Sequence, residues 1–215
     1  MEAITANLAN VDTPGYKRMS TGTRSFYVPG SNGKETAIYT HSAADWTQGA
    51  LKPSASPYHM ALMGQGFFAV DGQDGEMLTR NGIFQVDDKG ILQTAEGYPV
   101  AWESNNGPIN PTGEQIEVDG SGRVFQGTVD LGKLRLTNVA RPEQLSFLGG
   151  GYYTAGRNSS EVPAQTSVHQ SQLESSNVTS IDELVGMITV QRSFESAKNV
   201  MGLIDQSYGR LTQIR

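Results

Sequence analysis

The most regular pattern in the chain is the spacing of apolar residues between Ser180 and Thr212. Apolar side chains recur there at intervals that alternate between three and four residues. The set, called the seam below, is Met187, Val190, Phe194, Ala197, Met201, Ile204, Tyr208 and Leu211. This spacing is typical of a coiled coil, and it predicts one long helix.

A helix from Ser180 to Thr212 would be roughly 50 Å long at ~1.5 Å per residue. That length exceeds the diameter of a domain that the remaining residues could build, and the sequence shows no second helix of matching length. We therefore expect the helix to project from its domain or to pack between molecules. The alternative is an ordinary helix packed along its own domain.

Signals at the start of this helix and along it support the prediction. Ser180 and Glu183 have the S-x-x-E spacing of a capping box, in which each side chain accepts a hydrogen bond from a free backbone N–H group. Asn177 is an alternative cap. Glycines are costly inside a helix, so their presence suggests close neighbouring helices. They are Gly186, Gly202 and Gly209.

A second, shorter helix is predicted at the N-terminal end, over Glu2 to Asn10. Ile4 and Leu8 lie on one side of it, and Pro14 with Gly15 ends it. An isolated helix shorter than ~12 residues is marginal in water, so this one needs a partner. The long apolar seam is the available partner, and we expect the two ends of the chain to meet.

Between the helices, residues 64–140 predict an antiparallel β-domain that can fold on its own. Each pair of alternating segments is joined by a glycine-containing turn. The pairs are Gly66–Val70 with Glu76–Thr79, Ile83–Val86 with Ile91–Thr94, and Gln115–Val118 with Arg123–Phe125, followed by a further strand at Lys133–Val139. The aspartates in these turns lack the spacing of a calcium loop, so we interpret them as turn residues.

The flanking segments have weak periodicity. Residues 19–63 predict an extended arm with a short strand at Glu35–Thr40, and residues 141–176 predict an irregular return arm. With residues 1–18 and 177–215 as the helical ends, the chain divides into five segments. The predicted fold class is mainly β with a terminal α-helix: an antiparallel β-domain inserted between a short N-terminal helix and a long C-terminal coiled-coil helix.

Composition and charge limit the kinds of partner that the protein can bind. The chain has 215 residues, a formal net charge of −6 and no cysteine. A net anion without a basic patch is not expected to bind nucleic acid or an anionic membrane surface. No apolar run approaches the ~20 residues of a membrane span, and the N-terminal residues lack the pattern of a secretory leader. We expect no membrane insertion, no cofactor and no metal site.

Three separated blocks of the sequence resemble the axial proteins of the bacterial flagellum, specifically the rod proteins. The blocks are Ala6-Asn7-Leu8-Ala9-Asn10-Val11-Asp12-Thr13-Pro14-Gly15-Tyr16-Lys17-Arg18, then Gly64-Gln65-Gly66-Phe67-Phe68 with Thr79-Arg80-Asn81-Gly82 and Glu96-Gly97-Tyr98-Pro99-Val100, then Ser176-Asn177-Val178 with Glu183-Leu184-Val185, Met187-Ile188 and Gln191-Arg192-Ser193-Phe194-Glu195. Within the family, the short β-domain and Gly107-Pro108-Ile109 are more similar to proximal-rod than to distal-rod proteins. Family members carry roughly two dozen more residues before the first block.

The resemblance implies a structural subunit of the flagellar rod, located in the periplasmic part of the basal body. It implies a polymer in which the subunit packs through its terminal helices against itself and other rod proteins, and which transmits torque. The implied interface residues are Ile4, Leu8 and Asn10 together with the seam. The resemblance also implies delivery by the flagellar type III export apparatus without a cleaved signal peptide.

Two other classes of protein fit the sequence less well. An enzyme is disfavoured because His41, His59 and His169 lie in predicted arms, and no catalytic motif accompanies them. A surface adhesin, with a β-module on a coiled-coil stalk, would need a concave aromatic patch. The candidates for that patch, which are more typical of a core, are Phe67, Tyr98, Trp102 and Tyr153.

Overall fold

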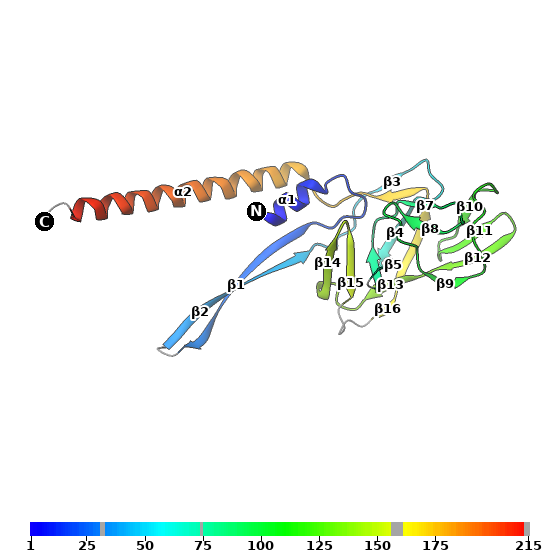
Figure 1. The fold of residues 1–215 in the computed structure, drawn as a ribbon, viewed down its shortest axis with the longest axis horizontal. Helices are drawn as coiled ribbons and strands as arrows, with labels where there is room; N and C mark the ends of the chain where they lie inside the picture. The colour runs from blue at the N-terminus through cyan, green and yellow to red at the C-terminus, as the bar shows by residue number, and fades with distance from the viewer. Residues whose placement is uncertain (31–32, 74, 156–160, 213–215) are drawn as a thin grey trace.

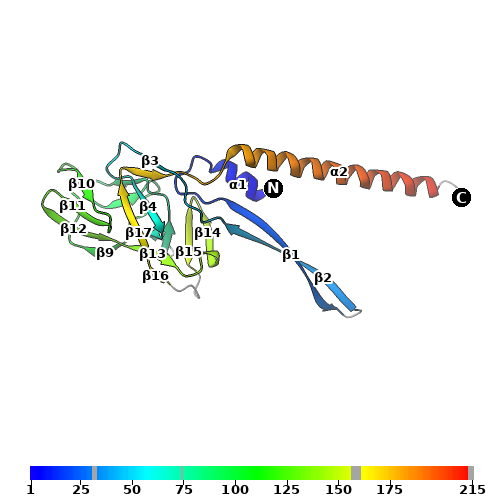
Figure 2. The same ribbon diagram turned by 180° about the vertical axis from the view of Figure 1, so that it is seen from behind.

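The computed structural model describes residues 1–30, 33–73, 75–155 and 161–212. A body of antiparallel sheets carries two projecting elements at one end (Figure 1). One is the long helix α2 (Ser180–Thr212), and the other is the hairpin of β1 (Met19–Gly30) and β2 (Gly33–Ala44). The short helix α1 (Glu2–Ala9) lies beside the base of α2, as the reverse view also shows (Figure 2).

The body is built from short strands that all pair antiparallel. The six-stranded sheet has the order β14 (Leu145–Gly149), β15 (Tyr152–Ala155), β6 (Gly75–Thr79), β5 (Phe67–Gly72), β13 (Leu136–Val139), β16 (Glu161–Pro163). The four-stranded sheet has the order β10 (Ile116–Val118), β11 (Arg123–Gln126), β12 (Val129–Leu134), β9 (Trp102–Asn105). Three two-stranded pairs are β17 (Gln165–Gln170) with β4 (Met60–Gln65), β18 (Gln172–Glu174) with β3 (Leu51–Pro53), and β7 (Phe84–Val86) with β8 (Leu92–Thr94). A 3₁₀ turn covers Pro142–Gln144.

The predicted fold class is confirmed: the protein is mainly β, with a short N-terminal and a long C-terminal helix. The three predicted hairpins form as β5–β6, β7–β8 and β10–β11. Aspartates of the second and third hairpins act as turn residues. Asp87 accepts hydrogen bonds from two backbone N–H groups of its own turn, and Asp119 does the same in the next hairpin.

The predicted single strand at Lys133–Val139 is wrong, because the chain changes sheets within it. β12 belongs to the four-stranded sheet and β13 to the six-stranded sheet. Arg135 lies between them, and its backbone N–H donates to the carbonyl of Ala101 at 2.9 Å. A register shift beside Leu134 accompanies the change of sheet. Periodicity cannot reveal such a crossing, since the alternation of side chains continues through it.

The predictions for residues 19–63 and 141–176, which were expected to be largely irregular, are also wrong. The N-terminal arm forms a hairpin twelve residues long on each side, where a short strand at Glu35–Thr40 was expected. Residues 141–176 contain β14 to β18 in place of an irregular arm. Several of these strands pair with partners far away in sequence, as in Val168 opposite Leu62. Because no local turn joins such partners, the sequence carries no hairpin signal for them.

The hydrophobic core therefore extends beyond residues 64–140. Its main cluster contains Phe68, Val70 and Phe84 from that range, and it also contains Met60, Leu62, Tyr152 and Val168 from the flanking segments. A second cluster around Phe67 and Tyr153 joins β5 to β15. The flanking strands both fill the core and complete the sheets.

These contacts predict how fragments behave. A fragment of residues 64–139 lacks β4 and β14 to β18, so we expect it to remain unfolded, whereas residues 45–178 should melt in one cooperative transition. Circular dichroism during heating of both fragments measures this. A cooperative melt of the shorter fragment would show that the six-stranded sheet does not need its outer strands.

Candidate assembly surface and helix junction

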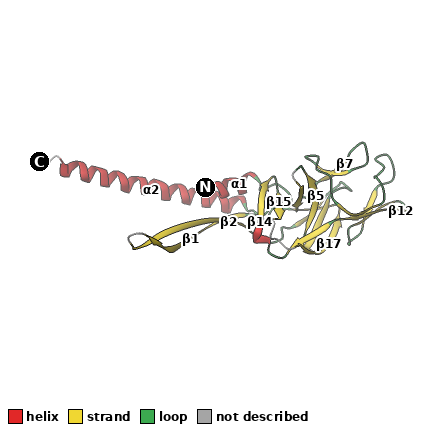
Figure 3. Ribbon diagram, turned by 60° about the horizontal axis from the view of Figure 1, so that its bottom comes forward, coloured by secondary structure: helices red, strands yellow, loops and turns green. Residues whose placement is uncertain are grey.

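Most of the seam on α2 is open to solvent in the single chain. The exposed fractions of Phe194, Met201 and Tyr208 are 69%, 59% and 67%. Met187, near the base of the helix, is half-buried. Val190, Ala197 and Ile204 are also exposed, and the side chain of Leu211 lies outside the described part of the structure. The helix projects from the body (Figure 3). The exposed residues therefore form an uncovered apolar stripe along it.

Further exposed apolar residues lie on α2 away from the seam, which the sequence analysis did not include. They are Ile181, Leu184, Val185, Ile188, Val200 and Leu203. At 3.6 residues per turn, these positions lie largely on the opposite side of the helix from the seam. A helix that is apolar on two sides is normally buried among several neighbours. The exposed surface of α2 is therefore wider than one coiled-coil partner would cover.

The helix α1 covers the base of the seam. The Cδ1 atom of Ile4 lies 3.6 Å from the position that a Cβ atom on Gly186 would occupy, so the glycine allows close approach. Leu8 and Asn10 are half-buried. The predicted meeting of the two ends of the chain is confirmed. Beyond the last turns that α1 reaches, a Cβ atom on Gly202 would meet open space among the described residues.

Helix α1 is tied to the hairpin by one buried side chain, Asn7. Its amide nitrogen donates to the carbonyl of Met19 at 2.8 Å, and its carbonyl oxygen accepts from the backbone N–H of Met19 at 2.7 Å. The hydroxyl of Tyr16 donates to the same oxygen. The side chain thus pairs with the first residue of β1 as a neighbouring strand would. Asn10, by contrast, donates to the carbonyl of Ala6 within α1.

A buried charge cluster connects three distant parts of the chain at the base of the helices. The Glu174 carboxylate accepts from Lys17 Nζ at 2.6 Å and from Arg80 Nη1 at 3.1 Å. All three side chains are at most 7% exposed. Lys17 also donates to the carbonyl of Thr47, and Arg80 to that of Gly64. Two cations therefore share one carboxylate, with backbone carbonyls supplying further acceptors.

Burial shifts the pKa of the two cations. It lowers the pKa of Lys17 and of Arg80 below their ordinary values, because a charged group loses its hydration there. The charge of Glu174 acts in the opposite direction on both groups. The charge of the Glu174 carboxylate thus offsets part of the free-energy cost of burying two cations.

The connection into α2 is made by a second ion pair and one amide. Glu183, in the first turn of α2, accepts from Arg18 Nε at 2.5 Å. The Asn177 side chain accepts from the backbone N–H of Arg18 at 2.7 Å and donates to the carbonyl of Asp45 at 2.8 Å and to that of Thr47 at 3.1 Å. The predicted capping box is displaced by one residue, because α2 begins at Ser180 and the N–H of Glu183 donates to the carbonyl of Thr179 at 3.2 Å.

Close backbone packing joins the turn after α1 to the residues that follow β6 and to β18. Gly15 has a φ of +70°, and a Cβ atom on it would lie 2.2 Å from the carbonyl oxygen of Arg80. Its N–H donates to the carbonyl of Glu174 at 2.8 Å. A residue with a side chain would be strained and would collide with backbone, so glycine is required here. We call Asn7, Lys17, Arg18, Arg80, Glu174, Asn177 and Glu183 the helix junction.

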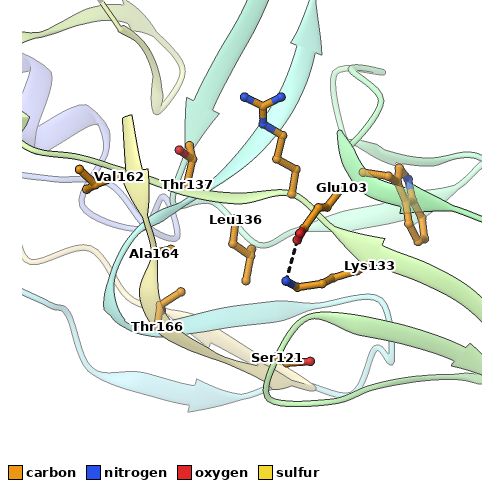
Figure 4. A pocket seen from close by; sticks show the side chains of 10 residues that line it. Glu103, Ser121, Lys133, Leu136, Thr137, Val162, Ala164 and Thr166 are labelled. Carbon is orange, nitrogen blue, oxygen red and sulfur yellow. Dashed lines mark ion pairs between the residues drawn. The ribbon is translucent and has the colours of Figure 1, made fainter. Parts of the chain in front are cut away.

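The aromatic residues considered for a binding patch belong to the core of the body. Phe67 and Tyr153 are buried, and Tyr98 and Trp102 pack against the core. A groove of about 660 Å³ runs between β9, β13 and β17, and Figure 4 shows Lys133 on its floor pairing with Glu103 at 2.6 Å. Over the described ranges, no three His, Asp or Glu residues are grouped for a metal ion, and neither helix is long and apolar enough to cross a membrane.

Comparison with known proteins assigns the architecture. Residues 1–17 match the family described as flagella basal body rod protein, and residues 61–126 match the flagellar hook protein FlgE/F/G D1 domain. Residues 169–214 match the flagellar basal body rod FlgEFG protein C-terminal family. The flagellar basal-body rod protein FlgF of Caulobacter vibrioides is 31% identical over 94% of this chain and 85% of its own length. This chain belongs to the flagellar basal-body rod protein family.

Other rod proteins are similarly related. FlgG of Buchnera aphidicola from Acyrthosiphon pisum is 33% identical over all of this chain and 93% of its own length, and FlgF of Escherichia coli K12 is 30% identical over 99% and 91%. The chain is thus a structural rod subunit of the flagellum basal body, of the FlgF or FlgG kind. The helix junction lies where the three matched segments of this rod protein meet, since Lys17, Arg80 and Glu174 each come from a different one.

Sequence reasoning found the seam but missed the junction. Lys17, Arg18, Arg80 and Asn177 all lie within the motifs that carried the resemblance, yet among these four the sequence analysis gave a role only to Asn177, as an alternative cap of the long helix. The available signal was the presence of charged residues inside motifs that were otherwise apolar or glycine-rich. Pairing them with Glu174 required knowledge of which segments meet.

Proposed function

We propose that this rod subunit assembles through its terminal helices, with the seam, Ile4, Leu8 and Asn10 buried against neighbouring subunits. The observation that supports this most is the exposure of apolar residues along α2 in the single chain. Leaving such a stripe in water is unfavourable at ~25 cal/mol per Å² of apolar surface. Contacts between different faces of identical subunits produce open helical polymers, which is the geometry of a rod.

The apolar residues on the other side of α2 extend the proposal. Ile188 and Leu203 lie outside the seam and are exposed. In a two-stranded coiled coil these positions would remain in water. We therefore propose that each α2 packs among several helices, in an inner helical layer, while the sheet body forms an outer layer.

The remaining parts of the proposal come from family membership. The proposed partners are further copies of the chain and other rod proteins, and the proposed location is the periplasmic part of the basal body, where the rod transmits torque. Delivery by the flagellar type III export apparatus is compatible with a chain that has no cysteine and needs no disulfide to fold. The similarity to proximal-rod rather than distal-rod proteins stays a prediction.

Sedimentation of the purified chain across a concentration series tests the assembly surface. We expect the average mass to rise with concentration, because pairing of helices buries the seam. Hydrogen exchange of α2 should slow over the same range. A chain that stays monomeric, with α2 fully protected from exchange, would show that the seam needs no second molecule.

A further inference from the structure

The base of the hairpin is closed by a side chain that belongs to neither strand. β1 begins directly after Arg18 and β2 ends directly before Asp45, and the N–H of Asp45 donates to the carbonyl of Arg18 at 2.8 Å. The Asn177 amide continues this ladder, because it accepts from Arg18 N–H and donates to the Asp45 carbonyl. One side chain therefore contacts both ends of the hairpin.

The same residue is close to the start of α2. Asn177 precedes Ser180, the first residue of the helix, by three positions, and its own N–H donates to the carbonyl of Tyr16 at 3.4 Å. Without such contacts the link between β18 and α2 would be a short segment free to rotate about its backbone torsions. Beyond the part beside α1, the helix projects away from the sheet body (Figure 1). The direction of α2 is thus decided at its base.

A small rotation of α2 at its base displaces the far end of the helix by a large distance. With ~1.5 Å per residue, α2 extends roughly 50 Å, so each degree of rotation at its base displaces its far end by about 0.9 Å. Knob-into-hole packing of apolar side chains requires registration much finer than one helical turn. The hairpin projects from the same base, so its direction is subject to the same lever effect (Figure 2).

We propose that Asn177, with Arg18, is a positioning residue for assembly: it fixes the angle between the β1–β2 hairpin and helix α2, so that both projecting elements reach neighbouring subunits at once. The Arg18–Glu183 ion pair holds the first turn of α2 to the same point. Asn7 fixes α1 to the hairpin through Met19 in a similar way. The inference rests on the proposed assembly through the terminal helices.

The test uses Asn177→Asp, which keeps the size and the acceptor of the side chain but removes its donor. A carboxylate oxygen would then face the carbonyls of Asp45 and Thr47, and the two acceptors would repel. The natural chain has no cysteine, so spin labels can be placed on Ser25→Cys in the hairpin and Asn199→Cys in α2, both exposed in the structure. Samples diluted with unlabelled protein report distances within one molecule.

We expect a narrow distance distribution for the natural junction, and a broader one with a shifted mean for Asn177→Asp. The unfolding midpoint of the body should change little, because the Asn177 contacts lie near the surface. Asn106→Asp is the matched control: that amide donates to the carbonyl of Asp130 at the far end of the body, so its loss should leave the distribution unchanged. Arg18→Ala should also broaden the distribution, and Arg18→Lys should restore it.

Assembly is measured separately, by motility of cells whose own gene copy is replaced. Reduced motility with an altered distance distribution is the expected result. An unaltered distribution in both Asn177→Asp and Arg18→Ala would overturn the positioning role, even if the chain assembles. A chain that does not associate at all, but whose distribution responds to the variants, would instead refute the proposed assembly surface.

Discussion

Replacing Glu174 by glutamine should destabilise the protein more than any other single substitution of a polar residue considered above. The change leaves Lys17 and Arg80 without their counter-charge at a site where both side chains are at most 7% exposed. Breaking a buried ion pair on one side costs about 3–5 kcal/mol, because an uncompensated charge stays buried. Since whole domains are stable by only about 5–15 kcal/mol, a large part of the population would unfold under mild denaturation.

Urea unfolding followed by circular dichroism measures this loss. Glu103→Gln is the matched control, because its carboxylate also pairs with a lysine but is 60% exposed, and such pairs contribute at most about 1 kcal/mol. The transition midpoint should fall strongly for Glu174→Gln and hardly for the control, with similar slopes. If the urea midpoint fell by the same small amount for both variants, water would have to reach the buried charge cluster.

Replacing Phe194 by aspartate should abolish motility while leaving the isolated chain folded. Phe194 is 69% exposed in the single chain, so the substitution removes no contact within the body. In the assembled rod the seam is buried according to our proposal, and a carboxylate there would lose its hydration without a partner. The cost of several kcal/mol per subunit repeats along the polymer.

Phe194→Leu provides the control for Phe194→Asp. It changes the same position of the same helix but keeps the side chain apolar, so the residue can still be buried against a neighbouring helix. Swimming in soft agar should be lost for the first variant and retained for the second, and the urea midpoints of both should equal that of the natural chain. Normal swimming of the Phe194→Asp strain would contradict burial of the seam.

The parts of the fold visible in the sequence are those specified by near neighbours. The boundaries of α2 followed from its spacing, and the hairpin of Phe84–Val86 with Leu92–Thr94 followed from a glycine turn. The strands of residues 141–176 did not, because β15 and β17 pair with β6 and β4 across long stretches of chain. Their side chains are also mixed in polarity, which weakens the alternation on which a strand prediction depends.

The candidate site likewise has one part that could be predicted from the sequence, the seam, and one that could not, the helix junction. The seam could be identified because eight positions on one helix repeat at a fixed interval. The junction could not, because Glu174 and Arg80 are 94 positions apart and Lys17 is 157 from Glu174. Glu183 shows the limit most clearly: its spacing from Ser180 fits a capping box, but nothing in the sequence indicates that its carboxylate pairs with Arg18.

The buried charge cluster also determines when the N-terminal segment can dock during folding. Its two cations come from the beginning and the middle of the chain, whereas its carboxylate comes from near the end. A partly emerged chain that holds Lys17 and Arg80 without Glu174 would have to bury two like charges with no counter-ion, so the N-terminal segment cannot dock in its final position. The junction closes when residue 174 arrives. Until then the short helix α1 has no fixed place, and a subunit presents its assembly surface in the correct geometry only after nearly the whole chain is available.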